Sequence, residues 1–270
     1  MLNRSQRSNL ALIACLSVAL MAMAAPAALT QSMTAEDIIE KNIAARGGLS
    51  AGRNIQTMTM TGQLDVGSKQ NVQLPFVLKL KRARMSRLEI EFAGKTALQV
   101  YDGSNGWKVR PFLNRMEVEP FTQPEMEGAA EQQELDGFLI DHAAKGIKAE
   151  FVGIEPVEGH NAYKLKLTLQ NGKIRNLWVD ASSFLEVKVE GVPRRLDDKI
   201  HKVEIYYRDY RKVGGVMIPF VLETVVENAT PSRKISIETV NLNPKFEDNL
   251  FGKPDISGVH VIKQAEGGPK

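Results

Sequence analysis

Apolar and polar residues alternate with a period of two through most of the chain between residues 55 and 242. A strand with one dry face and one wet face produces this pattern. Short turn-forming links separate the alternating rows, so we expect consecutive strands to pair antiparallel. The rows predict about eleven strands, at 55–64, 72–80, 87–92, 96–101, 106–109, 163–169, 174–179, 185–189, 203–210, 216–226 and 235–242.

Two turns are strongly marked between these strands. Residues 102–106 read Asp-Gly-Ser-Asn-Gly, and Asn171-Gly172 is a favoured two-residue hairpin turn. No linker and no repeat of about 20–50 residues divides the chain. We therefore expect one domain over residues 25–252, followed by a loosely ordered tail rich in Gly, Pro and Lys at 253–270.

The period changes to that of a helix in two places. At residues 35–46, Thr34 is a capping residue, apolar residues follow at helical spacing, and Gly47-Gly48 ends the pattern. Residues 123–145 form a second helical segment, which Gly137 divides into two helices and Gly146 ends. Its acidic residues are interpreted as a solvated face, with attraction to a basic partner as the alternative.

The first residues are typical of an export signal. Arg4 and Arg7 precede an apolar run from Leu10 to Ala25, which is shorter than the roughly 20 residues of a spanning helix. Small residues at 22 and 24 predict cleavage of a signal peptide, 1–24, after Ala24, with Ala28 as the alternative site. The mature protein is then expected in the periplasm.

A lipoprotein box is the rival interpretation of the same leader, because Leu12-Ile-Ala-Cys15 loosely fits one. Few apolar residues precede Cys15, and the apolar run continues beyond it, so soluble export is favoured over a lipid anchor at Cys15. Cys15 is the single cysteine of the chain. Its removal leaves a mature protein without a disulfide or thiol chemistry.

Composition and motifs argue against several classes of function. The 270-residue chain is 43% apolar and 25% charged, as in an ordinary folded protein. Without Arg4 and Arg7, 33 basic residues face 32 acidic ones, so the net charge is +1, which argues against a nucleic-acid partner. No Gly-x-Ser-x-Gly elbow and no short zinc spacing occurs, and the four histidines are far apart. We expect no enzyme activity, no cofactor and no metal.

A sheet of this length creates a packing problem. Its apolar face is larger than two or three helices can cover tightly, so either the sheet curls upon itself or the helices roof a cavity. A pocket beneath movable helices would suit an acyl chain.

Several stretches resemble the outer-membrane lipoprotein-sorting family, the LolA/LolB superfamily. Residues 101–112, from Tyr-Asp-Gly to Trp-Lys-Val-Arg-Pro-Phe, are similar to its strand–turn–strand ending in Trp-x-x-x-Pro-Phe. Residues 177–186 resemble its hairpin in which a strand ends in Asp. Residues 217–220 and 240–251 resemble its closing strands. The similar stretches occur in the family's order across nearly the whole mature chain.

The resemblance implies a fold and a ligand. The fold is mainly β with α, a curved and incomplete antiparallel barrel whose concave face is covered by helices. The implied ligand is the acyl part of a lipoprotein, held in a hydrophobic cavity. The family also implies a strand arginine that latches the lid, for which Arg84 and Arg87 are candidates.

On this basis the inward-facing apolar rows become cavity candidates. They are Met58, Met60, Phe76, Leu78, Leu80, Leu88, Ile90, Phe92 and Trp107. The lid candidates are Leu135, Phe138 and Leu139. Plain core packing is the alternative for Met58 and Met60, and the rows at 76–80 and 88–92 belong to the core in either interpretation. For Trp107 a strand anchor is slightly favoured over a place at the cavity mouth.

The favoured function is a monomeric periplasmic carrier, chaperone-like, that shields acyl chains of lipoproteins or phospholipid during transport towards the outer membrane. Its expected partners are an inner-membrane donor complex and an outer-membrane acceptor. The alternative is an envelope domain that senses lipids and acts on a protein partner. A hydrolase is a third interpretation that no motif supports.

Overall fold

The structure is a computed structural model that describes residues 33–67, 72–82, 84–132 and 135–256. The expected signal peptide and both cleavage sites lie outside the described residues, as does the tail from residue 257. The boundaries of the expected domain therefore remain a prediction.

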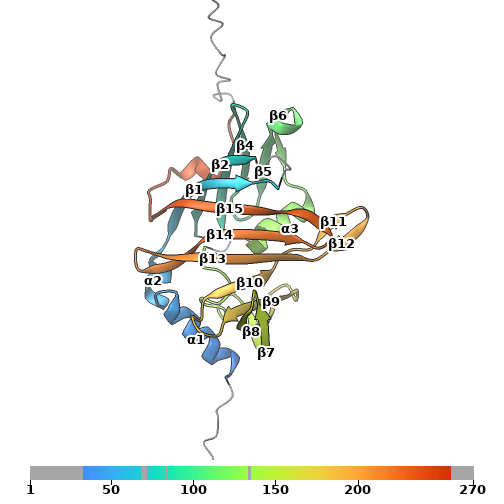
Figure 1. Cartoon of the computed structure of the whole chain (residues 1–270). Helices are drawn as coiled ribbons and strands as arrows, with labels where there is room; N and C mark the ends of the chain where they lie inside the picture. Colours follow the sequence, from blue (N-terminus) through green and yellow to red (C-terminus); the bar gives the residue numbers. More distant parts are fainter. Residues whose placement is uncertain (1–32, 68–71, 83, 133–134, 257–270) are drawn as a thin grey trace, which may run out of the picture. The chain divides into compact units, whose positions relative to one another are not determined.

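Thirteen strands form one antiparallel sheet in the order β6-β5-β4-β3-β2-β1-β15-β14-β13-β10-β9-β8-β7. The sheet curves and stays unclosed, with β6 at one end and β7 at the other (Figure 1). The strands are β1 (Thr57–Asp65), β2 (Gln73–Lys81), β3 (Met85–Phe92), β4 (Lys95–Tyr101), β5 (Gly106–Arg110), β6 (Arg115–Pro120), β7 (Lys148–Val157), β8 (His160–Thr168), β9 (Ile174–Asp180), β10 (Glu186–Glu190), β13 (Val203–Val213), β14 (Val216–Val226) and β15 (Ala229–Leu242).

The sheet consists of two runs of antiparallel strands joined where β1 pairs with β15. A bulge follows Thr61 at this seam, and Gly62 lies against the facing backbone. A Cβ at Gly62 would lie 2.0 Å from the Ser236 carbonyl oxygen, so the close approach requires glycine.

All eleven predicted strands are present, and four further strands were missed. Strand β6 is a mostly exposed edge strand, and β7 contains a bulge near Gly153 and a proline at Pro156, which obscure the alternation. Strands β11 (Arg194–Leu196) and β12 (Lys199–His201) form a separate short hairpin of largely exposed residues. A hairpin joins β8 to β9 as predicted, with Gly172 at φ +78°, but its loop is longer than the two residues expected, because the Leu169 N–H donates to the Lys173 carbonyl oxygen.

Helix α1 (Ala35–Ala45) begins as the sequence indicates. Thr34 and Asp37 form a reciprocal capping box, and Ile38 and Ile39 are buried. A short helix, α2 (Leu49–Asn54), follows Gly47-Gly48, and the sequence pattern did not predict it.

The predicted pair of helices at residues 123–145 is only half correct. Helix α3 (Gln123–Gln132) is present, but residues 135–146 form a series of turns. Gly137, Asp141 and Gly146 all have φ values between 54° and 75°, in the left-handed region, and such residues interrupt an α-helix. We call residues 135–147 the turn segment.

Two apolar clusters lie side by side on the concave face. The first lies between α1, the turn segment and strands β7 to β10, and its fully buried members include Ile38, Leu139 and Leu165. The second is built on β1, β2, β14 and β15, around Met58, Phe76 and Phe220, and Leu135 packs against it.

The opposite face of the sheet is covered locally by the C-terminal segment. The 3-10 helix η2 (Asp248–Phe251) contacts β3, and Phe251 is 2% exposed. Pro254, which the sequence placed in a loose tail, is also buried.

Candidate functional site

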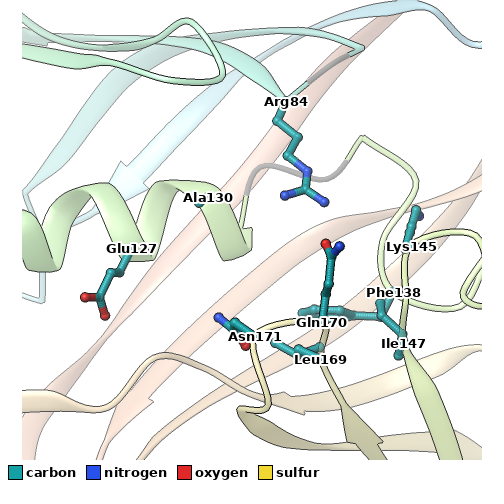
Figure 2. Close-up of a pocket in the computed structure, with 9 residues that line it drawn as sticks. All are labelled: Arg84, Glu127, Ala130, Phe138, Lys145, Ile147, Leu169, Gln170 and Asn171. Atoms are coloured by element: carbon teal, nitrogen blue, oxygen red, sulfur yellow. The ribbon is translucent and has the colours of Figure 1, made fainter.

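A cavity of about 310 Å³ lies between α3, the turn segment, the β8–β9 turn and the loop after β2 (Figure 2). Nine residues line it, and they come from four places far apart in the sequence: Arg84, Glu127, Ala130, Phe138, Lys145, Ile147, Leu169, Gln170 and Asn171. This volume is at the lower end of the range of about 300–1,000 Å³ for pockets that hold small molecules.

The cavity has an apolar part and a polar part. Phe138, Ile147 and Leu169 lie together in Figure 2, and all three belong to the first apolar cluster or pack against it. Figure 2 also shows the Arg84 guanidinium and the Gln170 amide pointing toward one another across the cavity. The cavity can therefore accept an amphipathic molecule.

Helix α3 is attached to the sheet by a buried lysine. Lys108 on β5 is 4% exposed, and its Nζ donates to both carboxylate oxygens of Glu125, at 2.6 and 2.5 Å. Glu125 also accepts hydrogen bonds from the backbone N–H and hydroxyl of Thr122. Partial burial alone would raise the pKa of the Glu125 carboxyl, but these hydrogen bonds hold it below its ordinary value.

The turn segment is attached by Asp136, which is 5% exposed. Its carboxylate accepts hydrogen bonds from Arg82 Nη1 at 2.8 Å and from Lys145 Nζ at 2.7 Å. Arg82 also donates to the carbonyl oxygens of Ile55 and Gly52, at 2.7 and 2.8 Å. Arg82 thus links α2 and β2 to the roof of the concave face.

The structure places the two arginines that we considered as latches in different surroundings. Arg87 points to the outer face of the sheet, where it pairs with Glu89 and donates to the Leu250 carbonyl oxygen. Arg84 lines the cavity. The arginine that donates to the carboxylate of Asp136 in the turn segment is Arg82, which directly follows β2.

A second buried ionic contact lies beneath the turn segment. Arg46, at the end of α1, has its Nη1 3.5 Å from Glu186 Oε1 and donates to the Asp136 carbonyl oxygen at 3.1 Å. Tyr210 donates its hydroxyl to the Glu186 carbonyl oxygen. Burial, followed by the charge of Glu186, raises the pKa of the Tyr210 phenol well above its ordinary value, so Tyr210 stays neutral.

Seven of the nine strand candidates lie together in the second apolar cluster. Met58 and Phe76 are buried core members, and the others pack against them half-buried: Met60, Leu78, Leu80, Leu88 and Ile90. Their common face follows from the register, in which Met60 pairs with Leu78 and Leu78 pairs with Leu88. Leu135 packs against the same cluster, but none of the seven residues lines the 310 Å³ cavity.

Two strand candidates lie elsewhere. Trp107 pairs with Val100, and Val100 pairs with Arg87, so Trp107 is on the outer face of the sheet, opposite to Leu88. The period-two pattern does not reveal which face of a strand is the concave one. Phe92 is 38% exposed at the end of β3.

The three lid candidates divide between the two apolar clusters. Phe138 lines the 310 Å³ cavity, whereas Leu139 is fully buried in the first cluster. Leu135 and Met58 line a separate small cavity of about 30 Å³. The turn segment therefore spans both clusters, although it is not helical.

Most residues of the larger cavity were missed from the sequence. Ala130, Ile147 and Leu169 are ordinary apolar residues without a distinguishing motif, and Gln170 lies in a hairpin turn. Arg84 offered one signal, because an arginine occupies a turn between two apolar strands. We considered it as a lid latch, not as a cavity residue.

Neither a metal centre nor a spanning helix is found in the part of the chain that the structure describes. No group of three or more His, Cys, Asp or Glu side chains there could hold a metal ion. Its helices are too short or too polar to cross a bilayer.

Comparisons with known proteins show the fold. No family model matches the chain, and no curated protein does. Among solved structures, a LolA superfamily protein from Nitrosomonas europaea matches with a TM-score of 0.55 and 16% identity, over 82% of this chain and 99% of that one. An outer membrane lipoprotein-sorting protein domain from Vibrio parahaemolyticus matches with a TM-score of 0.54 and 13% identity, over 80% and 95%.

A DUF1329 family protein from Desulfovibrio piger is equally similar, with a TM-score of 0.54 and 13% identity over 80% and 96% of the two chains. At these identities the comparisons concern the fold alone. The chain has a LolA-like fold, a mainly antiparallel, curved and unclosed sheet with few helices. The fold and the resemblance predicted from the sequence are confirmed at this level.

Proposed function

We propose that the protein is a periplasmic carrier that binds the acyl chains of lipoproteins or other lipids and shields them during transfer towards the outer membrane. The observation that supports the proposal is the pair of apolar clusters on the concave face, against which α1 and the turn segment pack, together with a 310 Å³ cavity between the turn segment and α3. An inner-membrane donor, an outer-membrane acceptor and a monomeric, non-enzymatic protein belong to the same proposal.

The energetics of such a site favour reversible binding. Burying acyl carbons contributes about 0.8 kcal/mol per methylene, so a chain of about a dozen carbons supplies near 10 kcal/mol before the costs of association. Displacing the turn segment opposes this gain, because Asp136 and Arg46 then lose partners. A modest net affinity allows the ligand to pass to an acceptor.

Native mass spectrometry of the protein purified from periplasm, with extraction of its lipids, tests the proposal. An acylated peptide or a phospholipid at near one per protein is the expected result. An empty, folded protein that also takes up no acyl probe would contradict the carrier function. In that case capture of one stable partner would favour the sensing alternative.

A charge on the concave face tests the position of the ligand. Leu78→Glu places a carboxylate among apolar side chains of the second cluster, and we expect acyl-probe affinity to fall about tenfold or more. Thr59→Glu is the matched control, because Thr59 pairs with Lys79 on the outer face of the same two strands. Unchanged binding in a folded Leu78→Glu variant would remove the second cluster from the site.

A further inference from the structure

Exposed apolar side chains gather at one end of the sheet. The antiparallel pairing brings the end of β1 at Asp65, the end of β5 at Arg110 and the start of β13 at Val203 to this same end, which we call the rim. Among the described residues, ten large apolar side chains are 37–68% exposed. Eight of them lie at the rim: three in the β5–β6 turn and the start of β6, two in the β11–β12 hairpin, and one each just after β1, at the end of β3 and at the start of β9. Single exposed apolar residues are ordinary, but this concentration indicates an interaction surface.

The turn between β5 and β6 exposes two apolar side chains at the rim. It is formed by the 3-10 helix η1 (Pro111–Leu113), beside β6 at the top of Figure 1. Pro111 is buried and fixes the start of the turn, whereas Phe112 and Leu113 are each 52% exposed. These two side chains contribute little to the core and are accessible to a partner.

The β11–β12 hairpin is the second exposed element of the rim. Its two strands belong to no larger sheet, and Ile200 has the largest exposed fraction of the ten side chains, 68%. Asp197 and Asp198, with φ values of 47° and 59°, form its tight two-residue loop. The base of the hairpin is fixed, because His201 Nδ1 lies 2.8 Å from the Glu227 carbonyl oxygen. The hairpin therefore presents Ile200 from a defined position.

Positive charge accompanies the hairpin. Residues 194–202 contain four Lys and Arg and two Asp, so their net charge is +2 with His neutral. Arg194 on β11 lies near Arg233 on β15, and burial followed by the charge of Arg233 lowers the pKa of the Arg194 guanidinium. Neither arginine forms an ion pair with a carboxylate of the described residues. Two like charges without an anion between them favour the approach of an anionic group such as a phosphate.

A lipid surface suits the rim better than a protein partner does. A stable protein interface buries about 800 Å² on each partner and needs complementary shape. The exposed apolar residues of the rim are instead distributed over short turns and strand ends. Apolar side chains on such turns can enter the head-group layer of a bilayer without a complementary shape, and Lys and Arg beside them attract anionic lipids.

We propose that the protein docks through the rim on a membrane that contains anionic phospholipid. Phe112, Leu113 and Ile200 enter the interfacial layer, and Arg194 and Arg233 lie near the phosphates of the head groups. The proposal goes beyond the carrier function and does not depend on it, because none of these residues lines the 310 Å³ cavity.

Flotation with lipid vesicles tests the docking. The protein is purified from periplasm, and its measured mass confirms that neither leader nor lipid anchor remains. It is mixed with vesicles of phosphatidylethanolamine and phosphatidylglycerol, and separately with vesicles of phosphatidylcholine. We expect the bound fraction to be about fivefold larger on the anionic vesicles, and to fall at about 0.5 M NaCl, which screens the arginines.

Substitutions at exposed positions separate docking from folding. Ile200→Asp and the double variant Phe112→Asp/Leu113→Asp should each lower the bound fraction about fivefold or more, at an unchanged unfolding temperature. Ile154→Asp is the matched control, because Ile154 is 56% exposed but lies in the middle of β7, away from the rim. All three variants should bind an acyl probe as the wild type does.

Each outcome bears on one claim. A wild type that binds neither kind of vesicle, or an equal loss of binding in Ile154→Asp, overturns docking through the rim and leaves the carrier function intact. Equal, salt-independent binding to both kinds of vesicle overturns the role of the arginines. Self-association that Ile200→Asp abolishes, without vesicle binding, would assign the rim to a second copy of the chain. A wild type that docks but takes up no acyl probe contradicts the carrier function alone.

Discussion

Asp136 connects the turn segment to the rest of the protein through two cations. Burial alone would raise the pKa of its carboxyl, but the hydrogen bonds from Lys145 and Arg82 lower it more, so the pKa lies below the ordinary value of 3.8. The stabilisation by this carboxylate is therefore complete above the ordinary value and is lost as the pH falls through the folded-state pKa.

Replacing Asp136 by Asn should lower the free energy of unfolding by about 2 kcal/mol at pH 7, because Arg82 and Lys145 lose their anionic partner. The difference between variant and wild type should shrink towards pH 3 and below, as the wild-type carboxyl is protonated. Urea unfolding at both pH values measures it. Glu150→Gln removes an exposed pair with Lys166 and should change little; an equal loss there would contradict the special role of Asp136.

At the scale of single elements, replacing a glycine by alanine should have opposite effects on stability at two positions. Gly62→Ala forces a methyl group against the Ser236 carbonyl oxygen at the β1–β15 seam, and should destabilise the protein by about 2 kcal/mol or more. Gly128→Ala meets nothing within 4 Å inside α3 and should stabilise the helix by about 0.5–1 kcal/mol. Thermal unfolding of both variants measures the two changes in stability. If both variants were destabilised or both stabilised, either the close approach at Gly62 or the open helical position of Gly128 would be contradicted.

The C-terminal segment is a second element whose role is local. Phe251 is 2% exposed and packs edge-to-face on Phe246, with ring centroids 5.5 Å apart. Phe251→Ala should cost about 3–5 kcal/mol, because it leaves a cavity against the outer face of β3. Phe112→Ala removes the same side chain at a site that is 52% exposed, and should be nearly neutral in chemical denaturation. A small effect of Phe251→Ala would show that the segment does not stabilise the sheet.

At the scale of the whole molecule, helix α3 buries fewer apolar side chains than the strands of the sheet do. Among the described side chains of α3 only Ala129 is buried, whereas Leu165 and Leu167 on β8 are completely buried. Local opening costs less where few apolar contacts must be broken.

Hydrogen exchange should therefore be faster in α3 than in β8 and β9, and should slow in α3 when an acyl ligand binds. Mass spectrometry of peptides from the labelled protein measures both rates. The β11–β12 hairpin is an internal control, since it lies outside the cavity lining and its exchange should not respond to ligand. Protection of β11–β12 instead of α3 would place the ligand elsewhere.

The strands themselves could be predicted because side chains on a strand alternate between faces, and one face here is apolar. The same reasoning failed for Trp107, since alternation assigns a residue to one of two faces but does not say which face is concave. It failed for residues 135–146 because apolar residues recur at helical spacing there, while Gly137 and Asp141 have left-handed φ values. Local spacing carries no information about such reversals.

By itself the sequence determined the antiparallel β architecture, the capped first helix and the apolar face, because each depends on neighbouring residues and on the burial of apolar area. Only the tertiary structure decided that β1 pairs with β15, that Arg82 rather than Arg84 holds Asp136, and that Arg84 faces a cavity. These contacts join residues far apart in the chain, and their distances depend on the curvature of the whole sheet.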